Sequence, residues 1–285
     1  MPRLAQPSEG DAFAWGPRGA GWFSSSMGRG LAILECFTPT RPLLRVVDIA
    51  ELVGMAESTT HRYLATLTAL GYLEQDDARK YRLALAVTRL GMATMSASSL
   101  PEHAHPYLQE LHRESNCTTV LATLHGAAAL CIERLPTLHR ERPAEPDPGP
   151  RLPLYCTAIG KVLLASPPPE EQNTLIAELA LKRHTPNTIT SKTELRAELN
   201  AMTGQGVAVD DQEFTLGQNA IAAPVRDQTE VVAAICIDSH AGRFSLEEMV
   251  EHLTPHLLVA ADRISARLGY RRGDERGERA GLAAR

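Results

Sequence analysis

The stretch from residue 46 to 83 constrains the fold most, because a short amphipathic helix, a glycine and a second helix lead directly into a basic hairpin pattern. The apolar residues of the first helix are Val46, Ile49, Ala50 and Val53. Their spacing is that of a single helical face. Gly54 follows, and glycine accepts the left-handed conformation that ends many helices. This order of elements predicts a helix-turn-helix.

The second helix, expected from about residue 57 to 70, has one apolar side and one side of small polar residues. Small side chains let a helix enter the major groove, where Arg62 can make two hydrogen bonds to one guanine. Two short strands at 72–74 and 80–83 would form a wing beside the phosphates. The predicted DNA-contacting residues are Ser58, Thr59, Arg62, Tyr63, Thr66, Arg79, Lys80 and Arg82. The alternative is a plain three-helix unit whose charges are merely solvated.

The net charge of −5 argues against a nucleic-acid partner until its distribution is considered. Residues 24–90 hold eight Lys or Arg and seven Asp or Glu, a net charge of +1, and the rest of the chain carries −6. A specific DNA reader needs only a local basic surface. Because this surface is weakly charged, we expect the affinity for DNA to depend strongly on two half-sites being bound at once.

Several motifs together carry a resemblance to a known family. They are SMGRGLAIL from Ser26, STTHRYL from Ser58, GYL from Gly71, YRL from Tyr81, RLPLYCTAIGKVLLA from Arg151 and IAAPV from Ile221. In this order, from about residue 24 to 270, they resemble the IclR-type transcriptional regulators. The resemblance implies an α+β fold: an N-terminal winged helix-turn-helix, a linker helix and a C-terminal mixed α/β effector-binding domain similar to GAF and PAS sensors. It also implies a homodimer, and in that family often a homotetramer.

On this basis the chain divides into five segments. They are a disordered arm (1–23), the winged helix-turn-helix domain (24–83), the linker helix (84–105), the effector-binding and oligomerisation domain (106–270) and a disordered tail (271–285). The arm contains four aromatic residues, Phe13, Trp15, Trp22 and Phe23. Docking of these aromatics on a partner subunit stays open.

The C-terminal part mixes strand and helix patterns. Strand patterns at 118–124 and 128–135 flank a turn, and a second pair lies at 220–225 and 231–238. Helical patterns fall at 107–114, 159–165, 170–181, 192–204 and 245–268. Two strand pairs with helices on either side predict a mixed sheet with one covered face.

A candidate effector site begins where a strand-like run enters the helix after Thr157, because the free N–H groups of a helix start attract carboxylates. Mapped by resemblance, the family's pocket corresponds here to Thr157, Ala158, Asp210, Asp211, Ala220 and Cys236. Cys156 and Asp238 complete the predicted set. Each position has an ordinary alternative, such as a helix cap for Thr157 or core packing for Cys236. Strand alternation puts Cys236 and Asp238 on one face, where Asp238 would repel a dicarboxylate.

Composition and cysteine spacing exclude several classes of protein. No apolar run reaches the ~20 residues of a membrane helix and the N-terminus lacks a signal-peptide pattern, so we expect a cytoplasmic protein without a membrane partner. The five cysteines are Cys36, Cys117, Cys131, Cys156 and Cys236. They lack the paired spacing of zinc or redox sites, so we predict no metal and no cofactor.

Two other functions compete with the regulator hypothesis. A thiol enzyme would use Cys156 at a helix start, where its thiol pKa could be lowered, together with a histidine such as His125. A DNA-binding architectural protein would need no ligand at all. The resemblance instead implies a non-enzymatic regulator that binds double-stranded operator DNA, a second copy of itself and a small-molecule effector, an organic acid or aromatic catabolite. Such an effector acts by favouring one arrangement of the two DNA-binding heads over another.

Overall fold

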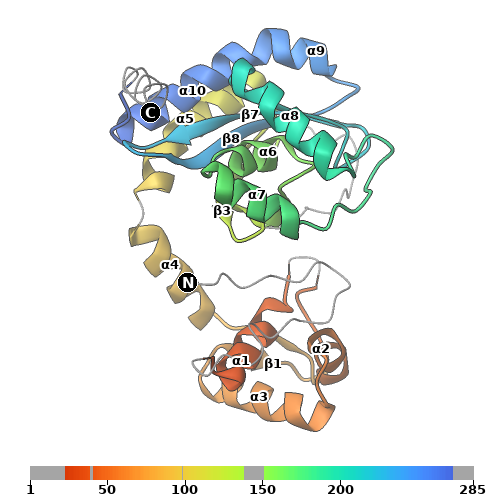
Figure 1. Cartoon of the computed structure of the whole chain (residues 1–285). Coiled ribbons are helices and arrows are strands. Elements are labelled where there is room, and N and C mark those ends of the chain that lie inside the picture. The colour runs from red at the N-terminus through yellow and green to blue at the C-terminus, as the bar shows by residue number, and fades with distance from the viewer. Residues whose placement is uncertain (1–22, 39–40, 98, 138–150, 272–285) are drawn as a thin grey trace. The chain divides into compact units, whose positions relative to one another are not determined.

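The computed structural model describes residues 23–38, 41–97, 99–137 and 151–271. The chain combines helices and strands in two compact units that divide between residues 99 and 100 (Figure 1). This confirms the predicted α+β class. Phe13, Trp15 and Trp22 of the predicted arm, and the predicted tail from residue 272 onward, lie outside the described residues.

The N-terminal unit is a winged helix-turn-helix, as predicted. Its elements are α1 (Ser25–Glu35), α2 (Val46–Val53), α3 (Glu57–Ala69), β1 (Leu73–Gln75), β2 (Tyr81–Leu83) and α4 (Ala86–Ala97). Ile33, Ile49 and Leu64 are fully buried in its core. Gly54 follows α2 with a φ of 62°, the left-handed conformation that its position in the sequence predicts.

The wing is supported by the chain that precedes α2. A hairpin of two strands alone is marginally stable in water. The backbone of Leu44 exchanges two hydrogen bonds with that of Tyr81, at 2.7 and 3.1 Å. The side chains of Tyr81 and Leu73 are buried in the same core as the helices. The hairpin is therefore attached to the helix-turn-helix through both backbone and side chains.

The C-terminal unit is built on a six-stranded sheet of order β5-β4-β3-β8-β7-β6. Its strands are β3 (Thr118–His125), β4 (Ala128–Leu135), β5 (Arg151–Pro153), β6 (Ala208–Asp211), β7 (Gln218–Arg226) and β8 (Val231–His240). Both predicted hairpins are present. All pairings between these strands are antiparallel, so the predicted mixed sheet is wrong.

Helices cover both faces of this sheet rather than one (Figure 1). The first face is covered by α6 (Ala158–Ala165), α7 (Pro169–Glu178) and α8 (Lys192–Gln205). The second is covered by α5 (Leu100–Ser115), α9 (Leu246–Glu248), the π-helix η1 (Met249–Leu253) and α10 (Thr254–Arg267). Strands β7 and β8 direct small residues such as Ala222 and Ala234 toward α6, and large ones such as Ile221 and Ile237 toward α10. Small side chains on the first face let α6 pack closely against the sheet.

Helix α5 begins at Leu100 rather than at residue 107. The predicted limit between linker and effector domain, after residue 105, therefore falls inside a helix. Pro106 lies within α5 and cannot donate the backbone hydrogen bond to a carbonyl four residues back. Because proline usually marks a helix start or break, the sequence pattern suggested a boundary here. The predicted linker, residues 84–105, is therefore not one helix. It contains α4 and the first turns of α5, which is a separate helix.

The predicted C-terminal helix is interrupted by η1. Ser245 caps its start through a capping box with Glu248, close to the predicted beginning. The N–H of Thr254 bonds to the carbonyl of Met249, five residues back, which makes the wider turn. Pro255 follows at once in the first turn of α10, where its missing N–H is tolerated.

Candidate DNA-binding and effector sites

Helix α3 presents small polar side chains outward, as the sequence predicts for a helix that enters a groove. Ser58, Arg62 and Thr66 are exposed. The hydroxyl of Thr66 donates to the carbonyl of Arg62 at 2.9 Å. Thr59 and Tyr63 are half-buried, and Tyr63 packs against the core. Of the predicted contacts on α3, those at 58, 62 and 66 are therefore the exposed ones.

The start of α3 has no side-chain cap. Ala56 occupies the N-cap position, where Ser, Thr, Asp or Asn would accept a hydrogen bond from a first-turn N–H. Uncapped N–H groups at a helix start attract phosphate. Ser58, exposed in this first turn, adds a hydroxyl beside them.

The turn of the wing is held by Asp76. Its carboxylate accepts a hydrogen bond from the backbone N–H of Lys80 at 2.8 Å. Arg79 adopts a φ of 58°, the left-handed conformation of a tight turn, and its side chain and that of Lys80 are exposed. Arg82 differs, because its guanidinium pairs across the hairpin with Glu74 at 2.8 Å. Of the three predicted wing contacts, Arg82 thus has its charge offset by a neighbour.

Four of the predicted effector residues share one face of the sheet. Asp210 on β6 is paired with Ala220 on β7, which is paired with Asp238 on β8. Paired residues point to the same side of a sheet, and Cys236 lies two residues before Asp238 and faces the same way. This is the face that α6 covers. Asp211 follows Asp210 directly and faces the opposite side, so the structure separates it from the other four.

Thr157 caps helix α6. Its hydroxyl accepts a hydrogen bond from the N–H of Gly160 at 3.1 Å and donates to the carbonyl of Pro153 at 2.6 Å. A Cβ on Gly160 would lie 2.3 Å from that carbonyl oxygen, so only glycine fits there. Ala158 is buried with the rest of the helix. The ordinary alternative for Thr157, a helix cap, is realised.

Cys156 does not have the properties of a catalytic thiol. It is fully buried. Burial first, and then the nearby Asp210 and Glu213, raise the pKa of its thiol. The enzyme alternative requires the helix start to lower this pKa, whereas burial raises it, as in structural rather than catalytic thiols. His125, its suggested partner, is an exposed residue at the end of β3.

A buried ionic cluster adjoins these residues and was not part of the predicted site. Lys161 of α6 has no exposed surface, and its Nζ donates to Glu213 Oε1 at 2.5 Å. The backbone N–H of Glu213 in turn donates to Asp210 Oδ1 at 2.7 Å. Burial raises the pKa of Asp210 to about 7. A single lysine in the apolar run AIGKVLLA was the only sequence signal for this cluster.

The segment 179–191, between α7 and α8, is anchored on the turn after β6. Thr188 Oγ1 donates to the carbonyl of Glu213 at 2.6 Å, and Thr185 Oγ1 donates to that of Gln212 at 2.7 Å. The ring of His184 stands edge-on to that of Phe214, with centroids 5.1 Å apart. Burial lowers the pKa of His184. These contacts attach segment 179–191 to the turn at 212–214.

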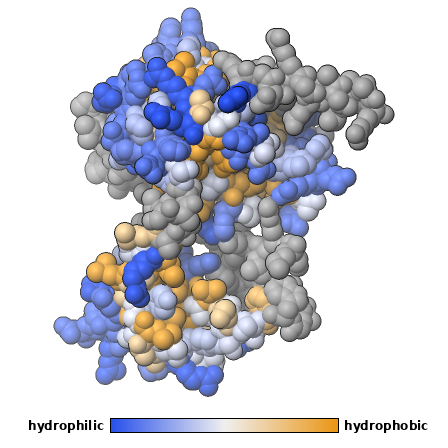
Figure 2. All heavy atoms as spheres, turned by 90° about the vertical axis from the view of Figure 1, so that its left-hand side faces the viewer, coloured by the Kyte–Doolittle hydropathy of each residue, from blue (hydrophilic) through white to orange (hydrophobic). Residues whose placement is uncertain are grey.

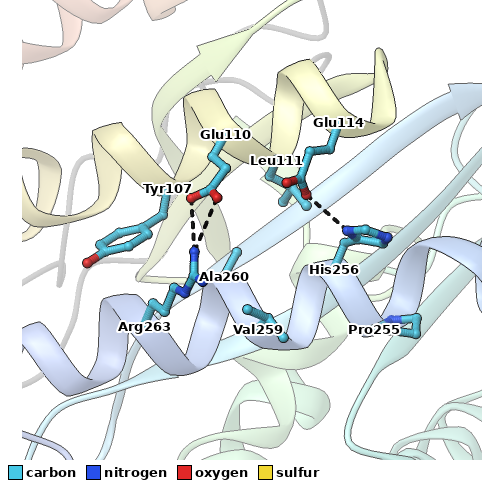
Figure 3. A pocket seen from close by; sticks show the side chains of 9 residues that line it. All are labelled: Tyr107, Glu110, Leu111, Glu114, Pro255, His256, Val259, Ala260 and Arg263. Atoms are coloured by element: carbon cyan, nitrogen blue, oxygen red, sulfur yellow. Dashed lines mark hydrogen bonds and ion pairs between the residues drawn. The ribbon is translucent and has the colours of Figure 1, made fainter.

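A separate groove of about 210 Å³ lies between α5 and α10, on the opposite side of the sheet from α6 (Figure 3). Arg263 pairs with Glu110 at 3.0 Å and His256 with Glu114 at 2.9 Å across it. No predicted effector residue lines this groove.

The described residues contain no group of three or more His, Cys, Asp or Glu that could hold a metal ion. All five cysteines are free thiols. Within that same part of the chain, no helix combines the length and apolar character needed to cross a membrane.

Comparison with known proteins identifies both units. Residues 26–77 match the IclR helix-turn-helix domain, and residues 92–266 match the C-terminal domain of bacterial IclR transcriptional regulators. The Pca regulon regulatory protein of Pseudomonas putida is 32% identical over 240 residues, which cover 84% of this chain and 82% of that protein.

Two solved structures are similar over most of the chain. A transcriptional regulator from Rhodococcus sp. RHA1 is 35% identical, with a TM-score of 0.73 and coverage of 87% of this chain and 99% of the other. An IclR homologue from Microbacterium hydrocarbonoxydans, complexed with 4-hydroxybenzoate, is 27% identical, with a TM-score of 0.73 and coverage of 84% and 97%.

Replacing Thr157 with Ala should lower the free energy of unfolding of the C-terminal unit by about 0.5–2 kcal/mol, because the cap of α6 is lost. Thr157→Ser keeps the hydroxyl and should cost much less. Urea denaturation followed by circular dichroism measures both variants. Equal losses for Ala and Ser would contradict the capping role and point to packing of the Thr157 methyl group.

Proposed function

We propose, because the chain belongs to the IclR family of bacterial transcriptional regulators, that α3 reads operator DNA in the major groove while the wing contacts phosphates. The observation that carries this proposal is the exposed face of α3, on which Arg62 stands between two small hydroxyl residues. The chain is a DNA-binding regulator and not an enzyme.

The contacts divide into base readers and phosphate contacts. Arg62 reads guanine, with Ser58 and Thr66 beside it, and the half-buried Thr59 and Tyr63 support their placement. On the wing, the exposed Arg79 and Lys80 meet the phosphate backbone. Arg82 contributes least among the wing residues, because Glu74 already offsets its charge.

Arg62→Ala should weaken binding to an operator selected from random DNA by about 1–3 kcal/mol and relax the preference at one base pair. The matched variant Lys80→Ala should weaken all sequences alike and reduce the dependence of log affinity on log salt by about one unit. Fluorescence anisotropy at several salt concentrations measures both. Unchanged operator affinity in Arg62→Ala would remove Arg62 from the reading set.

The regulator acts as a dimer. Met27 and Leu31 lie one turn apart on α1 and are 69% and 56% exposed, and Leu85, Leu90 and Met92, in and next to α4, are exposed as well. Figure 2 shows apolar side chains gathered on the surface of the N-terminal unit. Exposed apolar patches of this kind mark interfaces. In a symmetric dimer the same exposed residues of a second copy pack against these. The dimer also presents two DNA-binding segments, each with a net charge of only +1.

Leu31→Glu should convert the dimer to monomers, because the carboxylate would be buried at the interface without a partner. Operator affinity should fall by at least about tenfold once the two half-sites are no longer bound together. Leu216→Glu, which replaces a leucine of the C-terminal unit that is 65% exposed, is the control. Analytical ultracentrifugation reports the mass, and a dimer that survives Leu31→Glu would place the interface elsewhere.

The effector is a small organic acid, with aromatic acids as the first candidates, bound on the α6 face of the sheet. An IclR homologue of known structure holds 4-hydroxybenzoate. The proposed contacts are Cys156, Thr157, Ala158, Asp210, Ala220, Cys236 and Asp238, without the oppositely directed Asp211. Because Asp210, Ala220 and Cys236 are buried, effector entry requires local opening of this face. The effector then shifts the unit toward the conformation that binds it better.

Addition of 4-hydroxybenzoate should change operator affinity by a factor between about 5 and 150, the usual range of coupling between two sites. Anisotropy titrations of labelled operator with increasing acid measure this factor. 4-Hydroxybenzamide, which lacks the carboxylate, is the control. If neither this acid nor a panel of aliphatic and aromatic acids alters operator affinity, the chain is a ligand-independent architectural protein.

A further inference from the structure

The buried cation of the C-terminal unit is already committed to a partner. Lys161 Nζ contacts Glu213 Oε1 at 2.5 Å, the carbonyl of Val209 at 3.0 Å and Glu198 Oε1 at 3.3 Å. The side chains of Lys161 and Glu213 are 0% and 8% exposed. A buried ammonium needs such partners, because leaving water is costly for a charge. Its charge is therefore balanced within the fold.

Glu213 connects three parts of the unit. Its side chain holds α6 through Lys161, and its carbonyl accepts hydrogen bonds from Thr188 at 2.6 Å and Thr185 at 3.2 Å. Its N–H fixes one oxygen of Asp210 at 2.7 Å. Its second carboxylate oxygen is buried and has no hydrogen-bond partner among the described residues. Glu213 thus fixes the orientation of the Asp210 carboxyl group, while burial raises the pKa of Glu213 itself and the adjacent Lys161 lowers it.

The charges around Asp210 are mostly negative. Glu213 of the following turn and Asp238 of β8 face it, and Lys161 of α6 is the cation beside it. The thiols of Cys156 and Cys236 also lie within its electrostatic reach. Burial, with the repulsion of Glu213 and Asp238, raises the pKa of Asp210 to about 7. A carboxylate ligand placed here would meet Asp210 while Lys161 is already paired with Glu213. Arg134 of β4, whose charge reaches Cys236, is a further cation on this face of the sheet.

We infer that Lys161 and Glu213 are positioning residues that hold Asp210 as a hydrogen-bond donor, so that the site takes up an anionic effector together with one proton. The proton comes from solvent and resides on the Asp210 carboxyl group, whose O–H donates to the effector carboxylate. The inference rests on the proposed function, since it requires the effector to meet Asp210. It adds that the site selects acids and that their binding depends on pH.

The sign of the pH dependence follows from the proton. Well below its pKa of about 7 Asp210 is already protonated, so an acid binds without taking up a proton. Above pH 7 the proton must be acquired, and the affinity should fall by about tenfold for each pH unit. A neutral ligand would show no such fall.

The first test is the titration of Asp210 in the free, full-length protein, followed by the ¹³C signal of its carboxyl carbon. Asp210→Asn identifies the signal. Glu213→Gln removes the repelling charge but keeps the backbone N–H, so the midpoint should fall. The double variant Lys161→Met/Glu213→Gln has neither charge, and its midpoint should lie between those of the single variant and the wild type.

This order of the three Asp210 midpoints distinguishes an electrostatic effect of Lys161 and Glu213 from structural damage. The double variant contains no unpaired buried charge from this pair and should fold even if Glu213→Gln does not. A wild-type midpoint near 4, or one midpoint shared by wild type and the double variant, would overturn the inference. Thermal unfolding of all variants shows whether any shift merely follows lost stability.

The second test is calorimetry with 4-hydroxybenzoate at pH 6 and pH 8, in phosphate and in Tris buffer. The difference in heat between buffers gives the number of protons taken up, which should be near zero at pH 6 and about one at pH 8. Asp210→Asn should bind with the same affinity at both pH values. Binding without proton uptake at pH 8 rejects the inference alone, whereas no binding at either pH rejects the proposed effector and the inference with it.

Discussion

Helix α6 has no exposed face, and much of the C-terminal unit follows from that constraint. Its residues from Ala158 to Leu164 are all buried. The N–H groups at the helix start must therefore find hydrogen-bond acceptors inside the fold, and the hydroxyl of Thr157 accepts one of them. The helix also passes the carbonyl of Pro153 so closely that residue 160 has no room for a side chain. Lys161, in the middle of the helix, must find its counter-charge in the interior. A stretch of eight residues thus sets the requirements that its surroundings meet.

The DNA-reading helix has the opposite property. Only one side of α3 is buried, and its exposed residues include the short Ser58 and Thr66 and the longer His61 and Arg62. The core of Ile33, Ile49 and Leu64 holds this helix in place. In the C-terminal unit the small residues between α6 and the sheet let that helix pack closely.

The features that could be predicted from the sequence are those set by neighbouring residues. The helix-turn-helix, the left-handed Gly54 and both hairpins depend on local periodicity and turn residues. The edge strands β5 and β6 are too short to show alternation. The second covered face could have been predicted from β7 and β8, because both strands are apolar on their two sides, the pattern of strands buried on both faces.

The candidate sites divide in the same way. The exposed side of α3 follows from helical geometry, so its residues could be placed from the sequence. The partner of Lys161 lies 52 residues away, and no local pattern links the two. The separation of Asp211 from Asp210 needs only strand alternation, but β6 itself was not predicted. The ion pair between Arg82 and Glu74 depends on the register of the hairpin, which places the two residues opposite each other.

The bridge between Leu44 and Tyr81 makes the wing and the reading helices a single cooperative unit. Local opening of β2 must break both of its hydrogen bonds to the segment that leads into α2. The amides of the wing should therefore exchange with solvent at rates close to those of the helix-turn-helix core, rather than at the faster rates of a free hairpin. DNA would then meet a surface whose parts keep their spacing, and little ordering entropy would be lost on binding.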